Sequence, residues 1–154
     1  MIIEGPDHVT QAVLDEYGYT FELGKAKVLR GGNDVVLISS GLMTMRALQA
    51  AKALQAHKVD VAVVHTPTIK PFDADTVLAE LNTDRLALTL ENHTIRGGLF
   101  ETVASAAVLG GVHRQIRPVA LPDAFLDAGA LPTLHRKYGL DVDSIVTKVL
   151  DGLK

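Results

Sequence analysis

The sequence predicts an α/β fold in which helices cover both faces of a mostly parallel sheet. Short apolar segments alternate along the chain with segments whose apolar residues recur every three or four positions, and this alternation is typical of βαβ units. The short segments are almost continuously apolar, as strands are when both faces of a parallel sheet are buried. A chain of 154 residues fits one domain.

The strands are expected from residue 25 onward. Residues 25–30 alternate like an edge strand with lysines on one face, and the turn sequence Gly-Gly-Asn-Asp follows at residues 31–34. Four apolar, β-branched segments then have the length of buried strands. They are residues 35–38, 61–64, 86–90 and 116–120.

The helices are expected between these strands and after the last of them. In the first, Leu42, Leu48 and Leu54 fall on one face. Asp73 and Asp141 are of a residue type that caps helices, and each precedes a stretch with helical spacing. The expected helices are residues 42–54, a short one after Asp73, 102–109, 131–138 and a last one after Asp141.

Residues 1–24 are predicted to be a linker or arm that precedes a domain of residues 25–154. From residue 17 to 23, aromatic and apolar side chains alternate with small or polar ones, which is the period of an extended strand on a surface. Four large side chains would then form one contact surface. They are Tyr17, Tyr19, Phe21 and Leu23. We therefore expect the chain to associate at high concentration.

The composition narrows the classes of partner and location. Net charge is −3 and no basic run is present, so neither nucleic acid nor an anionic membrane is an expected partner. The sequence has no cysteine, which excludes disulfides and thiolate metal sites. No apolar run approaches the roughly 18 residues of a membrane span, and the first residues do not resemble a secretory signal. The expected location is the cytoplasm.

Polar residues follow three of the predicted strands. Ligands bind beyond the carboxyl ends of the strands in an open parallel sheet, so these residues are expected to meet at one edge. A glycine pair at the start of the next helix lies nearby. The candidate ligand or interface residues are Ser40, Gly41, His65, Glu91, His93, Gly97 and Gly98.

Two of these groups allow more than one interpretation. His65, Glu91 and His93 could form a metal site of two histidines and one carboxylate, but strand ends that satisfy loop backbone groups are the preferred interpretation, and no metal is expected. Gly97 and Gly98 could bind an anion at a helix N-terminus, or could permit a tight turn and close packing. The remaining histidines are expected to be solvated. They are His8, His57, His113 and His135.

Motifs for other chemistry are absent from the sequence. It contains no Gly-x-Gly-x-x-Gly, no Walker sequence and no Gly-x-Ser-x-Gly. A nucleotide-binding loop or a hydrolase triad therefore has no support, and no catalytic residue is assigned.

Four segments together resemble the C-terminal domain of transketolases. They are Phe-Glu-Leu-Gly-Lys-Ala at 21–26, Thr-Ile-Lys-Pro-Phe-Asp at 68–73, Leu-Glu-Asn-His-Thr-Ile-Arg-Gly-Gly-Leu at 90–99 and Tyr-Gly-Leu-Asp at 138–141. Their order and spacing agree over residues 17–154. Deoxyxylulose-phosphate synthases and the beta subunits of 2-oxoacid dehydrogenases share this domain, but Glu-Asn-His at 91–93 resembles transketolases more, especially those built from separate sections.

The resemblance implies a three-layer α/β/α fold with a five-stranded mixed sheet and one antiparallel strand. We identify residues 25–30 as that strand. Its pairing partner is left open, because the turn at 31–34 favours residues 35–38, whereas the family places another strand between them.

The resemblance also implies a function in which this chain is one part. It would be the C-terminal domain or subunit of a thiamine-diphosphate-dependent transketolase of the pentose phosphate pathway, transferring two-carbon ketol units between sugar phosphates. Thiamine diphosphate and magnesium would bind to the complete enzyme only, because the family's Gly-Asp-Gly motif is absent here and its activating glutamate belongs to the middle domain. The isolated chain would be inactive.

The implied partners are the N-terminal and pyrimidine-binding domains of the same enzyme, in a homodimer. Three alternatives remain open. The chain could belong to a deoxyxylulose-phosphate synthase, could be an interaction domain such as that of a 2-oxoacid dehydrogenase beta subunit, or could be a free-standing anion-binding module.

Overall fold

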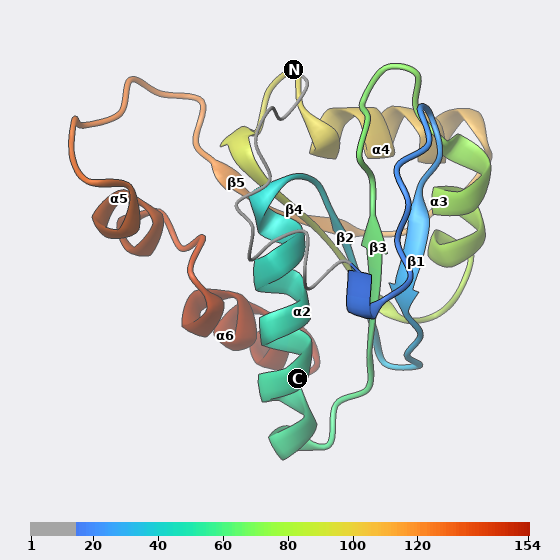
Figure 1. Cartoon of the computed structure of the whole chain (residues 1–154), viewed down its shortest axis with the longest axis horizontal. Coiled ribbons are helices and arrows are strands. Elements are labelled where there is room, and N and C mark those ends of the chain that lie inside the picture. The colour runs from blue at the N-terminus through green and yellow to red at the C-terminus, as the bar shows by residue number, and fades with distance from the viewer. Residues whose placement is uncertain (1–14) are drawn as a thin grey trace.

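Five strands form one sheet at the centre of the structure, a computed structural model that describes residues 15–154 (Figure 1). The strands are β1 (Lys27–Arg30), β2 (Val35–Ser39), β3 (Val61–His65), β4 (Leu86–Thr94) and β5 (Ile116–Leu121). Their order across the sheet is β1-β3-β2-β4-β5. Strand β1 is antiparallel to β3, and the other neighbouring pairs are parallel. The predicted mixed sheet is confirmed.

The open question of the pairing of β1 is settled by its contact with β3. Only residues 31–34 separate β1 from β2, yet this connection crosses the start of β3. At Gly32 a side chain would lie 2.3 Å from the Val61 carbonyl carbon, and the Arg30 guanidinium donates to the Val61 carbonyl at 2.8 Å. The turn therefore carries the chain past β3 and does not form a hairpin.

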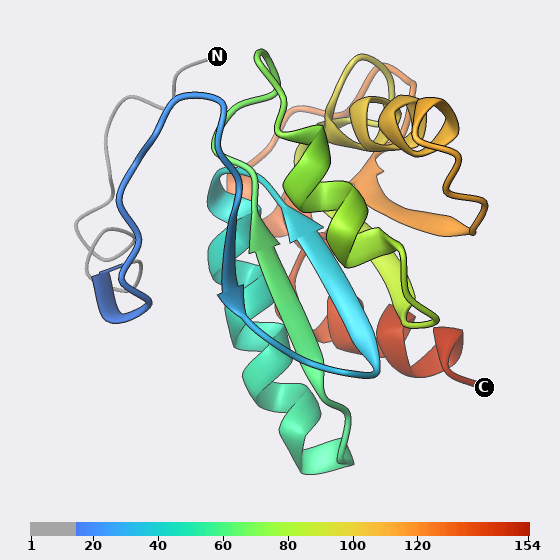
Figure 2. The ribbon, with the colours of Figure 1, turned by 90° about the vertical axis from the view of Figure 1, so that its right-hand side faces the viewer.

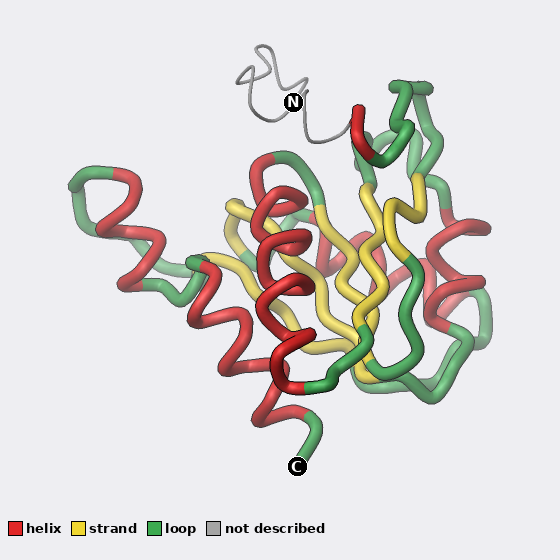
Figure 3. The backbone as a smooth tube through the Cα atoms, turned by 60° about the horizontal axis from the view of Figure 1, so that its bottom comes forward, coloured by secondary structure: helices red, strands yellow, loops and turns green. Residues whose placement is uncertain are grey.

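Helices cover both faces of the sheet, which gives three layers (Figure 2). On one face lie α2 (Leu42–Leu54), which continues into a 3₁₀ helix (Gln55–His57), and α6 (Val142–Gly152). The other face is covered by α3 (Ala74–Leu81) and α4 (Leu99–Leu109). A short helix, α5 (Leu131–Lys137), stands to one side of the sheet (Figure 3).

Strand β2 shows how the sequence builds both cores. Val35 and Leu37 pack with α2 and α6, whereas Val36 and Ile38 pack with α3 and α4. All four are fully buried. Complete burial of such a side chain stabilises the fold by about 1.5–3 kcal/mol, so a continuous apolar strand stabilises both layers at once.

The caps follow the prediction, and some element boundaries do not. Asp73 accepts a hydrogen bond from the Thr76 amide and Asp141 from the Ser144 amide, as expected of helix caps. Strand β4 was expected to end at residue 90, but it continues to Thr94. Helix α4 begins at Leu99, three residues before its predicted start.

The predicted strand at residues 17–23 is wrong. Gly18 closes a turn onto the Asp15 carbonyl, and no ladder forms. Tyr17 and Tyr19 pack against the core on the α2 side, whereas Phe21 and Leu23 are 60% and 65% exposed. The four side chains therefore do not share one face. Residues 1–14 of the predicted arm lie outside the described residues.

Among residues 15–154, no helix is long and apolar enough to cross a membrane.

Candidate functional site

Two groups of side chains lie at the carboxyl edge of the sheet, and each contains predicted site residues. In the register of the parallel strands, Ser39 at the end of β2 is opposite His65 of β3 and Leu90 of β4. The Ser40 amide donates to the Leu90 carbonyl at 3.2 Å, which links the two groups through the backbone. The expectation that these strand ends share one edge is therefore correct for the backbone.

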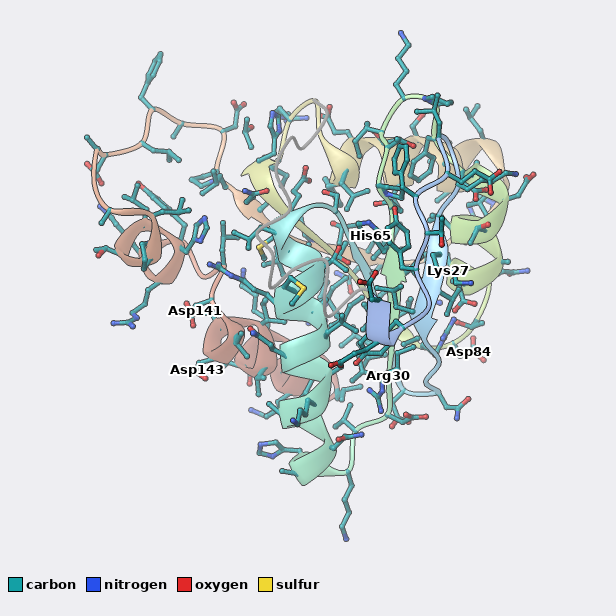
Figure 4. The ribbon with its side chains drawn as sticks, viewed as in Figure 1. Lys27, Arg30, His65, Asp84, Asp141 and Asp143 are labelled. Atoms are coloured by element: carbon teal, nitrogen blue, oxygen red, sulfur yellow. The ribbon has the colours of Figure 1, made fainter. Side chains whose placement is uncertain are left out.

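The first group, the histidine cluster, consists of Ser39, Thr44, His65 and Tyr19. His65 Nδ1 lies 2.7 Å from Thr44 Oγ1, and Ser39 Oγ lies 3.0 Å from the same hydroxyl. Tyr19 covers the imidazole edge-on, with the ring centroids 4.9 Å apart. Figure 4 shows His65 at the end of β3, beside β1.

His65 is neutral at physiological pH. Burial lowers its pKa from 6.5 to about 4, because the low dielectric of the interior disfavours the imidazolium. A neutral ring that is bonded to one hydroxyl and covered by Tyr19 can hold the segment that precedes β1 against the sheet. The sequence singled out His65 but not Thr44, which occupies the first turn of α2 and is 1% exposed.

The second group, the Glu91 cap, joins β4 to the N-terminus of α4. Glu91 is 2% exposed, and its carboxylate accepts hydrogen bonds from the Leu99 amide at 2.7 Å and the Phe100 amide at 2.9 Å. Gly98 is required beside it, because a Cβ there would lie 2.0 Å from Glu91 Oε2. The helix dipole and two amides therefore hold an anion that the chain itself supplies.

This arrangement bears on the two interpretations of the glycine pair. Gly97 has a φ of +72° and its amide donates to Glu101 Oε2 at 2.8 Å. The Gly97 amide and the Arg96 guanidinium hold the pKa of the Glu101 carboxyl below its usual value. With these amides bound to Glu91 and Glu101, the geometry favours the tight turn over an external anion.

The metal interpretation receives no support from the contacts of its three residues. His93 is exposed, and its Nδ1 lies 2.9 Å from the Thr94 carbonyl oxygen. His65 is bonded to Thr44, and Glu91 to backbone amides. Residues 15–154 contain no group of three histidine, aspartate or glutamate side chains placed to hold a metal ion.

The prediction that His135 is solvated is wrong. The side chain is 3% exposed, and its Nδ1 lies 2.5 Å from Arg46 Nη2, while Arg46 Nη1 donates to the Leu140 carbonyl at 2.5 Å. Burial, and then the Arg46 charge, lower the pKa of His135. His57 and His113 are exposed, as predicted, and His8 lies outside the described residues.

The residues at this edge, within the described part of the chain, do not fit a thiamine diphosphate site. The cofactor's diphosphate needs a metal-binding set of oxygen ligands, and no Gly-Asp-Gly occurs in the sequence. The buried carboxylate at the candidate edge, Glu91, already accepts two backbone hydrogen bonds. This edge provides packing and helix capping, so we assign it no catalytic step.

Comparison with known proteins identifies relatives over most of the chain. Residues 24–145 match the family model described as the transketolase C-terminal domain. A protein of Sinorhizobium fredii, described as transketolase family protein y4mN, is 54% identical over 143 residues, which are 92% of this chain and 41% of that protein. A transketolase C-terminal section of Methanocaldococcus jannaschii is 31% identical over 88% of this chain and 42% of that protein. A 1-deoxy-D-xylulose-5-phosphate synthase of Heliobacterium modesticaldum is 30% identical over 86% of this chain and 20% of that enzyme.

Solved structures show the same fold. A split-gene transketolase, described as an inactive beta4 tetramer, matches with a TM-score of 0.77 and 31% identity over 88% of this chain and 43% of that chain. The transketolase from Leishmania mexicana matches in fold, with a TM-score of 0.65 and 22% identity over 84% of this chain and 18% of that chain. This chain therefore spans less than half the length of each relative named here.

Proposed function

Since the chain belongs to the transketolase C-terminal domain family, we propose that it is the C-terminal part of a thiamine-diphosphate-dependent transketolase that transfers two-carbon ketol units between sugar phosphates. One observation supports this most directly. The 54%-identical relative is described as a transketolase family protein, and the match covers 92% of this chain but 41% of that protein. The remainder of such an enzyme, on this proposal, supplies the cofactor site.

The role proposed for this domain is assembly. Support comes from the carboxyl edge of the sheet, where His65 is bonded to Thr44 and covered by Tyr19, and Glu91 caps α4. These polar groups already have partners within the domain, which suits a rigid support for neighbouring domains. Thiamine diphosphate and magnesium belong to the complete enzyme on this proposal.

The proposed partner is the section with the N-terminal and pyrimidine-binding domains, in an assembly with two-fold symmetry. The split-gene neighbour supports a separately encoded partner, since its description pairs a split gene with an inactive assembly of one chain type. We propose that this chain is likewise inactive alone.

Reconstitution tests the proposal. The section with the thiamine-binding domains, expressed from the genome that encodes this chain, would be mixed with the chain, thiamine diphosphate, magnesium and pairs of sugar phosphates. Ketol transfer by the mixture and by neither component alone is the expected result. Failure of every mixture to assemble or transfer would contradict the proposal.

A second candidate is a part of a 1-deoxy-D-xylulose-5-phosphate synthase. The synthase of Desulforudis audaxviator is 33% identical to this chain, as similar as the 31%-identical transketolase section. Identity alone therefore does not separate the two activities. Formation of 1-deoxy-D-xylulose 5-phosphate by the same mixture, without ketol transfer between sugar phosphates, would favour this candidate.

A further inference from the structure

The connection from β5 to α6 leaves apolar side chains uncovered. We call residues 122–137 of this connection the α5 arm. Every residue from 122 to 133 is exposed. It projects from the upper left of the molecule in Figure 1 and stands apart from the sheet in Figure 3. Phe125 is fully exposed, and Leu126 and Leu131 are also exposed. Folded monomers rarely leave such a group of large apolar side chains in water.

Contacts at its base hold the α5 arm in this position. Arg46 of α2 reaches His135 of α5 and the Leu140 carbonyl just beyond it. Near the tip, Asp127 pairs with Lys137, and the Tyr138 hydroxyl lies 3.4 Å from the same carboxylate. These contacts hold the α5 arm out from the rest of the domain, and the Phe125 side chain is left in solvent.

We propose that the α5 arm docks on the enzyme section that precedes this domain, with Phe125 inserted into an apolar pocket of that section. This inference rests on the proposed function, which assigns the missing part of the enzyme to such a section. An exposed aromatic side chain on a preformed projection has the character of an interface anchor, because burying it on binding costs little ordering of the backbone.

The length of the relatives and the start of the described chain favour this occupant over a second copy. The chain spans 41% of the 54%-identical relative, so a larger part of that protein lies outside the match. The described chain enters on the α2 side, where Tyr17 and Tyr19 pack against the core that α2 and α6 share. The arm is fastened to α2 through Arg46. The segment before β1 and the α5 arm thus both contact the α2 layer, and a section that covers this layer would reach the arm.

A matched pair of variants tests the contact. The double variant Phe125→Ser, Leu126→Ser removes the apolar tip of the arm. The control, Val108→Ser with Leu109→Ser, removes two side chains that are 74% and 86% exposed at the end of α4, on the opposite layer. All four positions are exposed, so both variants should fold, which circular dichroism and the unfolding midpoint will verify. Calorimetric titration then gives the affinity of each for the thiamine-binding section.

We expect the arm variant to bind that section at least tenfold more weakly than the wild type, and the control to bind within twofold of it. Binding of the arm variant as tight as that of the wild type would overturn the docking assignment. The proposed function would still stand if the wild-type chain and the thiamine-binding section are active together. Equal weakening by the control would also overturn the docking assignment. Sedimentation of the chain alone supplies a third outcome, since loss of self-association in the arm variant with unchanged section binding would assign the arm to a second copy.

Discussion

Replacing Glu91 by glutamine should destabilise the domain strongly, although the two side chains have nearly the same shape. The Glu91 carboxylate accepts hydrogen bonds from the buried Leu99 amide at 2.7 Å and from the partly buried Phe100 amide at 2.9 Å. Glutamine keeps one acceptor oxygen, but its NH₂ group then faces the second amide. One charge-assisted bond is lost, at about 1.5–3 kcal/mol, and one amide is left without a partner, at about 1–3 kcal/mol. These two costs overlap, because the lost bond and the unpaired amide belong to the same interaction, and we expect a net loss of about 2–4 kcal/mol.

The assay is urea unfolding followed by circular dichroism, with linear extrapolation to water. In thermal unfolding, the same loss corresponds to a fall in Tm of roughly 5–15 °C for a domain of this size. The control is Glu101→Gln, which changes a carboxylate whose side chain is 42% exposed and which also accepts an amide hydrogen bond, from Gly97 at 2.8 Å. Its expected effect is much smaller, because its bonds to Gly97 and Arg96 are exposed to water.

Gly98→Ala provides an independent check on the same cap. Its Cβ would lie 2.0 Å from Glu91 Oε2, so the carboxylate must move and the capping bonds weaken. Both substitutions act on one contact, and the double variant should therefore lose less than the sum of the two single losses. A Glu91→Gln variant as stable as Glu101→Gln, or fully additive losses with Gly98→Ala, would refute the reasoning.

Three further predictions concern pH, the core and association. Burial lowers the pKa of His65 from 6.5 to about 4. Between pH 6.5 and pH 4 the unfolded chain therefore binds more protons than the folded one, and the free energy of unfolding should fall by about 3 kcal/mol as the pH drops through this window. Urea titrations at pH 7 and 4.5 should show this fall in the wild type and a smaller one in His65→Gln; equal falls would argue against it. Thr89 Oγ1 is buried without a hydrogen-bond partner among the described residues, so Thr89→Val should stabilise the fold by about 1 kcal/mol, and a loss of stability would count against this account. The double variant Phe21→Ser, Leu23→Ser should reduce self-association in sedimentation, because these two side chains are exposed while Tyr17 and Tyr19 pack against the core. A wild type that stays monomeric at its highest soluble concentration would contradict the prediction.

The sheet and its helices could be predicted because their signals are local. Four continuous apolar segments mark the parallel strands, and the capping side chains of Asp73 and Asp141 mark the starts of α3 and α6. The turn at residues 31–34 is just as local, but the pairing of β1 depends on β3, which lies a helix and a strand further along the chain. That pairing could not be read from the turn.

The meeting of the strand ends at one edge was predicted, and the contacts of the residues there were not. The rule that parallel strands end at one edge correctly places Ser39 opposite His65. The partners of these groups come from elsewhere: Thr44 belongs to the next helix, and Tyr19 belongs to a segment predicted as a free strand. The burial of His135 depends on Arg46, which is distant in sequence and carries no pattern that would pair the two.

Calorimetric titration of the lone chain with thiamine diphosphate and magnesium tests the central claim most directly. The claim is that this domain supports an enzyme whose cofactor site lies in other domains, since its sequence has no Gly-Asp-Gly and the carboxylate of Glu91 already caps α4. The account predicts no measurable binding to the chain alone, and binding once the thiamine-binding section is added. Micromolar binding of the cofactor to the lone chain would contradict it.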